Sequence, residues 1–191
     1  LYVANSGGYR VPMYDNTVSV IDLDSFTEIR KITVAINLHR MILDRHGNIY
    51  VGSRSDYKGM KSSTYVIDSQ DRISNVLDVS AGNMALRGDL LYVCGVEWNQ
   101  TTNSSSISYA IINTVSKSIV SRGFISNGTK IEKPYGIAIN PQTGEIYVTD
   151  ARDFINPGML YCFTPDGKRK WETITGDIPA HIVFTRKKLK D

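Results

Sequence analysis

A short apolar motif built on a Tyr-Val pair recurs four times, and it constrains this chain to a repeat architecture. The copies are Leu1-Tyr2-Val3-Ala4-Asn5, Ile49-Tyr50-Val51-Gly52-Ser53, Leu91-Tyr92-Val93-Cys94-Gly95 and Ile146-Tyr147-Val148-Thr149-Asp150. Their tyrosines lie 48, 42 and 55 residues apart. A spacing of this size indicates supersecondary units that stack on one another, because one such unit cannot bury its own apolar face.

Each motif has further β-rich runs around it. Short apolar runs precede three of the motifs, at residues 41–43, 84–86 and 137–139, and a turn containing Gly, Asn or Asp separates each run from its motif. A third set of runs follows at residues 18–22, 64–68, 107–111 and 160–163, and a fourth at residues 28–34, 73–79, 118–125 and 170–174. None of these runs has helical periodicity. The sequence therefore predicts an all-β fold of four-stranded antiparallel blades, which is a β-propeller.

The chain is expected to contain four blades. They are assigned to residues 1–34 together with 178–185, to 35–80, to 81–126 and to 127–176, and a basic tail follows at 186–191. Residues 182–184 have the pattern of the strand that the first blade lacks. Pairing of the two ends would close a four-bladed ring and remove open sheet edges, which promote aggregation. The other interpretation is that these are the later blades of a longer propeller.

Charge and cysteine content exclude several classes of function. The formal net charge is +3, but without the last six residues the chain has 18 basic and 18 acidic side chains, so no nucleic-acid-binding face is expected. No apolar run approaches the ~20 residues that a membrane-spanning helix needs. Cys94 and Cys162 are too few for a disulfide framework. The first residues have neither a Met nor a signal-like pattern, so any signal segment is expected to lie outside this sequence.

The repeats resemble those of a known group of propellers. A Tyr-Val-(Ala/Thr)-(Asn/Asp) strand followed by a Val-Ile-Asp strand is similar to the YVTN repeat of surface-layer and YncE-like propellers, and residues 134–150 also fit the broader NHL-type pattern. More narrowly, Gly7-Gly8-Tyr9, residues 150–161 and residues 176–181 resemble YncE-like surface propellers of gut Bacteroidetes.

This resemblance implies an architecture, a location and a ligand class. The group usually has seven blades, of which this chain would supply the C-terminal four; the closed four-bladed ring is the alternative. The implied location is the cell surface or the periplasm, with any lipoprotein anchor outside this sequence. Some members capture cobalamin for an outer-membrane transporter. The expected ligand is therefore a corrinoid, a glycan-like nutrient or a protein partner, and the resemblance implies an outer-membrane transporter as a further partner.

The long loops are the expected binding surface. In a propeller the connections after the second and fourth strands of each blade emerge on one face, and here the former are long: residues 5–15, 53–62, 95–104 and 151–158. They carry aromatic side chains beside charges or amides, which suit a polar-rimmed ligand. The candidate ligand-binding residues are Tyr9, Arg10, Tyr14, His39, Arg54, Asp56, Tyr57, Glu97, Trp98, Asn99, Tyr135, Arg152, Asp153, Phe154 and His181.

No catalytic residues, metal site or cofactor are predicted. The three histidines lie in different repeats, and neither a nucleophile elbow nor a phosphate-binding loop occurs. The favoured function is non-catalytic ligand binding. One alternative is a metal-dependent hydrolase or lyase of the lactonase propeller type, with Asn5, Glu97, Asp150 and Asp153 as candidate calcium ligands. Asn5 and Asp150 are more simply interpreted as caps of loop turns. A structural, protein-interaction propeller is the second alternative.

Overall fold

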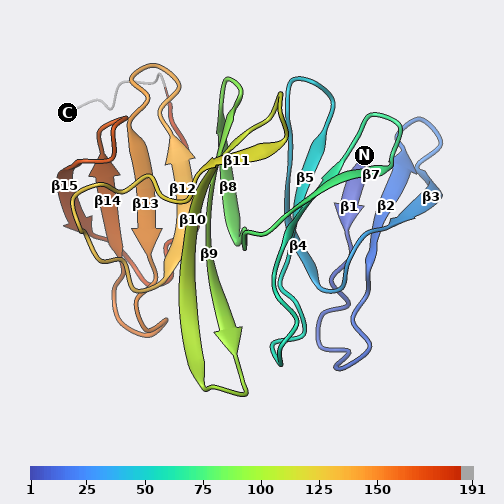
Figure 1. The fold of residues 1–191 in the computed structure, drawn as a ribbon, viewed down its shortest axis with the longest axis horizontal. Helices are drawn as coiled ribbons and strands as arrows, with labels where there is room; N and C mark the ends of the chain where they lie inside the picture. Colours follow the sequence, from blue (N-terminus) through green and yellow to red (C-terminus); the bar gives the residue numbers. More distant parts are fainter. Residues whose placement is uncertain (186–191) are drawn as a thin grey trace. The chain divides into compact units, whose positions relative to one another are not determined.

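The computed structural model describes residues 1–185, and the predicted basic tail at 186–191 lies outside them. Within that range every regular element is a β-strand, and no helix is present (Figure 1). The strands are β1 (Tyr2–Ala4), β2 (Thr17–Asp22), β3 (Thr27–Thr33), β4 (Leu38–Leu43), β5 (Ile49–Ser53), β6 (Thr64–Ile67), β7 (Ile73–Leu77), β8 (Asn83–Arg87), β9 (Leu90–Asn99), β10 (Ser104–Asn113), β11 (Ser118–Ser121), β12 (Pro134–Ile139), β13 (Ile146–Asp150), β14 (Met159–Phe163) and β15 (Arg169–Ile174).

The strands form four antiparallel sheets, each made of consecutive strands. Three sheets are four-stranded, with the orders β4-β5-β6-β7, β8-β9-β10-β11 and β12-β13-β14-β15. The remaining sheet has three strands, β1-β2-β3. A sheet of sequentially adjacent antiparallel strands is the unit of a propeller blade. The predicted all-β fold of four-stranded blades is thereby confirmed.

The chain packs as two compact units, Leu1–Gly123 and Phe124–Asp191. The first unit contains the sheets that begin with β1, β4 and β8, and the second contains the sheet that begins with β12.

In the first unit, β5 lies between two apolar clusters, and all five of its residues are buried. Tyr50 packs into a cluster with residues of β8, β9 and β10, including Val93 and Ile112. Its neighbours Ile49 and Val51 pack into the other cluster, with residues of β2, β3 and β4. This division follows from the pleat of a strand, which directs successive side chains to opposite faces. The Tyr-Val motif is therefore apolar at consecutive positions because each face of β5 meets a different neighbouring sheet.

Polar contacts join the same three sheets through their turns. Asp71, in the turn between β6 and β7, accepts a hydrogen bond from Tyr2 Oη at 2.8 Å and forms an ion pair with Arg30, both from the first sheet. Asp89, in the turn between β8 and β9, accepts a hydrogen bond from His46 Nε2 at 2.8 Å and pairs with Arg45 of the second sheet. Each carboxylate therefore links its sheet to the preceding one.

In the second unit, the segment that follows β15 packs against the sheet. The Thr149 hydroxyl donates a hydrogen bond to the Pro179 carbonyl at 2.5 Å, and the Phe184 ring packs edge-on against Tyr147 at 5.3 Å. Residues 181–185 adopt no strand conformation, so the strand predicted at 182–184 is wrong. Among the described strands β1 pairs with β2 alone. The closed four-bladed ring, the alternative expected from the sequence, needs a strand at 182–184 that pairs with β1. That strand does not form, because Phe184 packs on Tyr147 of β13 instead, so this alternative is wrong.

Gly52 allows a test of how closely β5 approaches the segment that connects β7 to β8. A Cβ atom at Gly52 would lie 2.3 Å from the Ala81 carbonyl oxygen, which is a backbone atom with little freedom to move. We expect Gly52→Ala to lower the free energy of unfolding by about 2 kcal/mol, measured by urea denaturation. Gly59→Ala is the matched control, because nothing lies within 4 Å of the position its Cβ would take. Equal stability of the two variants would contradict this close approach.

Candidate functional site

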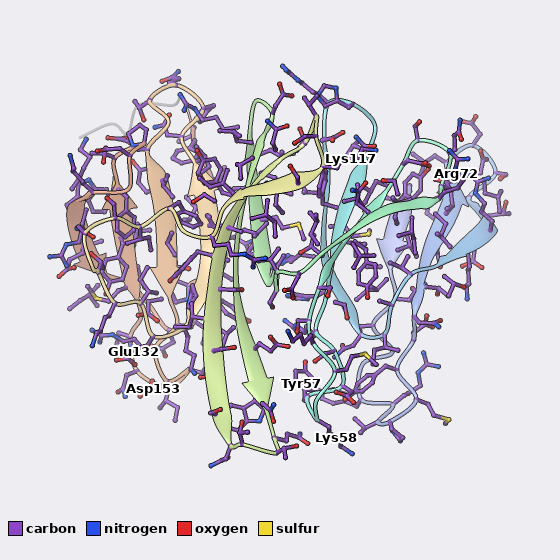
Figure 2. All side chains as sticks on the ribbon, viewed as in Figure 1. Tyr57, Lys58, Arg72, Lys117, Glu132 and Asp153 are labelled. Atoms are coloured by element: carbon purple, nitrogen blue, oxygen red, sulfur yellow. The ribbon has the colours of Figure 1, made fainter. Side chains whose placement is uncertain are left out.

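In the first unit the long connections lie at one end of the sheets. Figure 1 shows the β1–β2 loop, the β5–β6 loop and the tip of the β9–β10 hairpin at the end opposite the β4–β5 turn. Figure 2 places Tyr57 and Lys58 at this end, whereas Arg72 and Lys117 lie at the other. The candidate binding residues of this unit therefore belong to a common end of its blades.

The third connection is a β-hairpin where the sequence predicted a loop. Residues 95–104 were expected to form a loop, but β9 continues to Asn99 and β10 begins at Ser104, leaving a turn of residues 100–103. Trp98 pairs with Ser105 in the antiparallel register. The Asn99 side-chain oxygen accepts hydrogen bonds from the N–H groups of Thr101 and Thr102, which closes the turn tightly. Candidate residues Glu97, Trp98 and Asn99 are thus held on a strand.

The β5–β6 loop is shaped by its own acidic residue. One oxygen of Asp56 accepts backbone N–H bonds from Lys58, Gly59 and Met60 at 2.9, 3.2 and 3.1 Å. These donors, Lys58 first, hold the pKa of Asp56 below its ordinary value. Tyr57 has a φ of 59°, in the left-handed region that most side chains avoid. Asp56 therefore acts as the organiser of this loop.

Three hydrogen bonds join this loop to the neighbouring hairpin. The Gln100 N–H donates to the Tyr57 carbonyl at 2.8 Å, and the Thr101 hydroxyl donates to the Lys58 carbonyl at 2.9 Å. Further down, the Ser62 N–H donates to a Glu97 carboxylate oxygen at 2.7 Å. Two connections from different sheets therefore form one surface.

Two cavities lie along this surface. The first, which we call the loop cavity, has a volume of about 320 Å³ and is lined by Tyr57, Gly59, Met60, Lys61, Glu97, Trp98, Asn99, Thr102, Ser104 and Ser106. The second, the strand cavity, has a volume of about 370 Å³ and is lined by Lys61, Ser62, Asp78, Val79, Ser80, Glu97, Ile107, Ser108, Tyr109 and Arg122. Lys61 and Glu97 belong to the walls of both.

Sequence reasoning identified only part of the loop cavity. Tyr57, Glu97, Trp98 and Asn99 were candidates, whereas Lys61, Met60 and the β10 hydroxyls were not. A signal for the hydroxyls was present, because Ser104, Ser106 and Ser108 alternate with a period of two. On a strand that spacing puts them on one face. The signal was missed because the segment was interpreted as a loop.

His39 and Arg54 form a separate pair. The Arg54 guanidinium donates a hydrogen bond from Nη2 to His39 Nε2 at 2.7 Å, which requires an unprotonated ring nitrogen. Burial, together with the neighbouring charges of Arg54 and Arg40, lowers the pKa of His39 from its ordinary 6.5 to about 4. His39 is therefore neutral near pH 7.

The candidates of the β1–β2 loop line neither cavity. Arg10 lies 3.3 Å from the Asp15 carboxylate and also donates to the Gly7 carbonyl. Tyr9 is fully exposed and Tyr14 is half-buried. Of the binding candidates, the structure brings Tyr57, Glu97, Trp98 and Asn99 together in the loop cavity.

The second unit holds the remaining candidates. Tyr135 and Phe154 contact each other edge-on, with ring centroids 5.6 Å apart. Asp153 accepts N–H bonds from the two residues 155 and 156, which forms a turn within the β13–β14 loop. Arg152 donates to the carbonyl of residue 157 at 3.4 Å, and the side chain of His181 is exposed. Glu132 and Asp153 are labelled on this unit in Figure 2.

The four candidate calcium ligands have structural partners of their own. Asp150 is 2 % exposed, and its two oxygens accept backbone N–H bonds from residues 132, 133 and 152 at 2.7–2.9 Å. Asn5 donates to the hydroxyls of Thr17 and Ser19. Among residues 1–185, no three or more His, Cys, Asp and Glu side chains gather where they could hold a metal ion. Asp150 therefore caps a loop turn, as interpreted from the sequence, whereas the side chain of Asn5 bonds two hydroxyl groups of β2 instead of backbone groups.

The cysteines are buried, and burial raises the pKa of the Cys94 thiol to about 12. A thiol with such a pKa is protonated near pH 7 and is therefore a poor nucleophile.

Comparison with known proteins establishes the fold. No family model and no curated protein sequence matches the chain. Among solved structures, hydrazine synthase from Kuenenia stuttgartiensis is similar with a TM-score of 0.64 and 15 % identity, over 84 % of this chain and 44 % of that one. The Neurospora crassa Pan2 WD40 domain is similar with a TM-score of 0.58 and 12 % identity, over 86 % and 48 %. The dihydro-heme d1 dehydrogenase NirN is similar with a TM-score of 0.56 and 16 % identity, over 92 % and 34 %.

These similarities show that the chain has a β-propeller fold, and at such low identity they show the fold alone. The chain spans less than half the length of each of those three chains. In the part of the chain that the structure describes, no helix is long and apolar enough to cross a membrane.

The low pKa of His39 has a consequence for stability that can be measured. Between pH 6.5 and about pH 4 the unfolded state binds a proton at this ring and the folded state does not, so the free energy of unfolding falls as the pH falls through that window. We expect His39→Gln to lose this component of the pH dependence, measured by urea unfolding at pH 7, 6 and 5. His181→Gln, which changes an exposed ring, is the control. A midpoint for His39 near 6.5 in an NMR titration would contradict the prediction.

Proposed function

We propose that this chain is part of a non-catalytic ligand-binding β-propeller, and that the loop cavity captures a small, hydroxyl-rich ligand of the glycan type. The observation that carries the proposal is the composition of that cavity. Aromatic rings, hydroxyl groups, an amide, a carboxylate and an ammonium group converge on a space of about 320 Å³. Ligand pockets commonly begin near ~300 Å³ and combine apolar surface with a few placed polar groups.

The two kinds of wall match the two kinds of sugar surface. The rings of Tyr57 and Trp98 supply flat apolar area, which suits the C–H face of a pyranose. The hydroxyls of Thr102, Ser104 and Ser106 both donate and accept hydrogen bonds, as the hydroxyls of a sugar do. A ligand with one apolar face and a polar rim would therefore satisfy both walls.

The walls of the cavity are organised without a ligand. The hydrogen bonds from Gln100 and Thr101 to the β5–β6 loop join its rim, and the bond from Ser62 to Glu97 joins its base. A site that is already ordered loses less conformational entropy on binding, so a given set of contacts yields higher affinity.

Lys61 supplies a cationic donor to the site. Its side chain is exposed and takes part in no ion pair or hydrogen bond with residues 1–185. Glu97 lies in the same wall, with one oxygen engaged by Ser62. A neutral ligand with several hydroxyl groups can use both charges, as an acceptor for Lys61 and a donor to Glu97.

The proposal includes a location at the cell surface or in the periplasm, with an outer-membrane transporter as a further partner. Its support is the resemblance of residues 150–161 and 176–181 to surface propellers. A corrinoid is the rival ligand. The loop cavity lies at the small end of the range for ligand pockets, which favours a mono- or disaccharide over so large a molecule.

The two tryptophans allow a matched test of the loop cavity. Trp98 lines the cavity, whereas Trp171 lies on β15 of the second unit with a similar exposed fraction, 39 % against 42 %. We expect a panel of mono- and disaccharides, screened by isothermal titration calorimetry, to contain a ligand whose affinity falls roughly tenfold or more in Trp98→Ala, which corresponds to about 1.4 kcal/mol. Trp171→Ala should bind that ligand like the unmodified protein.

Two results would contradict the proposal. One is the absence of any binding heat across the panel, and the other is equal affinity in Trp98→Ala, Tyr57→Ala and the unmodified protein. Binding of cobalamin that depends on Trp98 would keep the site and replace the glycan by a corrinoid.

A further inference from the structure

A second site is indicated where β4 begins. The pairing of β4 with β5 is irregular between Leu38, which pairs with Ser53, and Met41, which pairs with Val51. Two residues, His39 and Arg40, therefore oppose one residue of β5, which is a β-bulge. Bulges redirect side chains from the regular faces of a sheet and occur often beside binding sites.

The bulge brings three basic side chains together. His39 accepts the hydrogen bond from Arg54, which directly follows β5, and the charges of both Arg40 and Arg54 act on the His39 ring. Neither arginine forms an ion pair within the described range 1–185. Two guanidinium charges therefore act on the His39 ring, and neither is neutralised by an ion pair among these residues.

Arg40 has an unsatisfied polar atom. Its Nε is buried and has no hydrogen-bond partner, and among buried side-chain nitrogen and oxygen atoms of the described residues it is the only one in that state. A buried N–H of a charged group that lacks an acceptor is costly, and such a group in a folded protein calls for an explanation. Arg40 as a whole is half-buried, so an anion from outside the chain would approach its guanidinium through the terminal Nη groups and offset the charge that this buried N–H carries.

The nearby acidic groups are already engaged. Asp15 accepts from Thr17 and Arg10, and Asp56 accepts from the N–H groups of its own loop. Neither of them pairs with Arg40 or Arg54 in the structure.

The backbone that carries Arg54 is anchored. Its N–H donates to the Asn37 carbonyl at 3.0 Å, and the neighbouring Ser53 hydroxyl donates to the Ile36 carbonyl at 2.8 Å. The Asn37 side chain donates to the Ser55 carbonyl at 3.1 Å. The neutral His39 ring accepts from Nη2 of Arg54 and so restrains the guanidinium, whose planar donors suit a planar acceptor.

We propose that Arg40, Arg54 and His39 form an anion-binding site that takes an oxyanion, a carboxylate or a phosphate group, through the terminal Nη groups of Arg40 and Arg54. The site is independent of the loop cavity, whose walls contain none of these three residues. Arginine is suited to this role because its planar donors match the geometry of carboxylate and phosphate oxygens.

The direct test is titration of the protein with inorganic phosphate, with acetate in a parallel arm and sodium chloride at matched ionic strength as the control. We expect the NMR signals of His39 to shift saturably with phosphate or acetate, and the His39 pKa to rise from about 4 because a bound anion offsets the two guanidinium charges. The arm with the higher affinity identifies the class of oxyanion. Shifts no larger than those in sodium chloride would overturn the proposal.

Two variants separate binding from a structural role. Arg54→Gln should weaken the affinity for the preferred anion at least tenfold, whereas Arg72→Gln, which changes an arginine paired with Asp68 in the β6–β7 turn, should not change it. Arg40→Met removes the buried Nε, so we expect the anion-free protein to unfold at a higher temperature and to lose its stabilisation by phosphate. A large drop in melting temperature with an unchanged response to phosphate would assign Arg40 a structural role and overturn the proposal.

Binding at the loop cavity provides the internal control. Sugar binding measured by calorimetry reports on that cavity, so a failed anion proposal leaves the sugar affinity unchanged. A failed glycan proposal likewise leaves the His39 titration unchanged.

Discussion

The structure of the first unit depends on the burial of both faces of β5. Tyr50 packs on one side with the sheet that begins with β8, and Ile49 and Val51 pack on the other side with strands β2, β3 and β4. No face of this strand can be left in water without exposing large apolar side chains, so each neighbouring sheet is required. Asp71 and Asp89 add polar links between the same sheets at their turns. The loops at the other end are thereby positioned by a packed framework.

That framework explains why the two proposed sites have defined geometry. The loop cavity is formed where connections from two adjacent sheets are joined by backbone hydrogen bonds, and Glu97 stands on a strand that the pairing of β9 with β10 holds in register. The anion site depends on a different device, the bulge that turns His39 and Arg40 out of the regular pattern of β4. Rigid elements position side chains more accurately than free loops do.

Much of this arrangement could be predicted from the sequence, and the failures have physical causes. The strands were predicted because alternation and turn residues are local signals, and Tyr57 and Trp98 were identified because aromatic side chains beside charges are conspicuous in loops. The hairpin at residues 95–104 was missed because all residues from Asn99 to Ser104 are polar, as is typical of a loop. The strand at 182–184 was predicted from three apolar residues, whereas Phe184 packs on Tyr147 instead. Arg40 was not identified, because only the tertiary structure shows that its Nε is buried without an acceptor.

The sequence by itself determined the class of fold, since a Tyr-Val motif repeated at blade spacing and separated by turns is compatible with few architectures. It also determined which connections are long, and hence which loops carry the aromatic and charged candidate side chains. Only the tertiary structure decided which of those side chains meet. Contacts such as Ser62 with Glu97 and Arg54 with His39 join residues that are 35 and 15 positions apart. They form because packing of the sheets and a bulge bring the residues together, and neither local propensity nor periodicity encodes that distance.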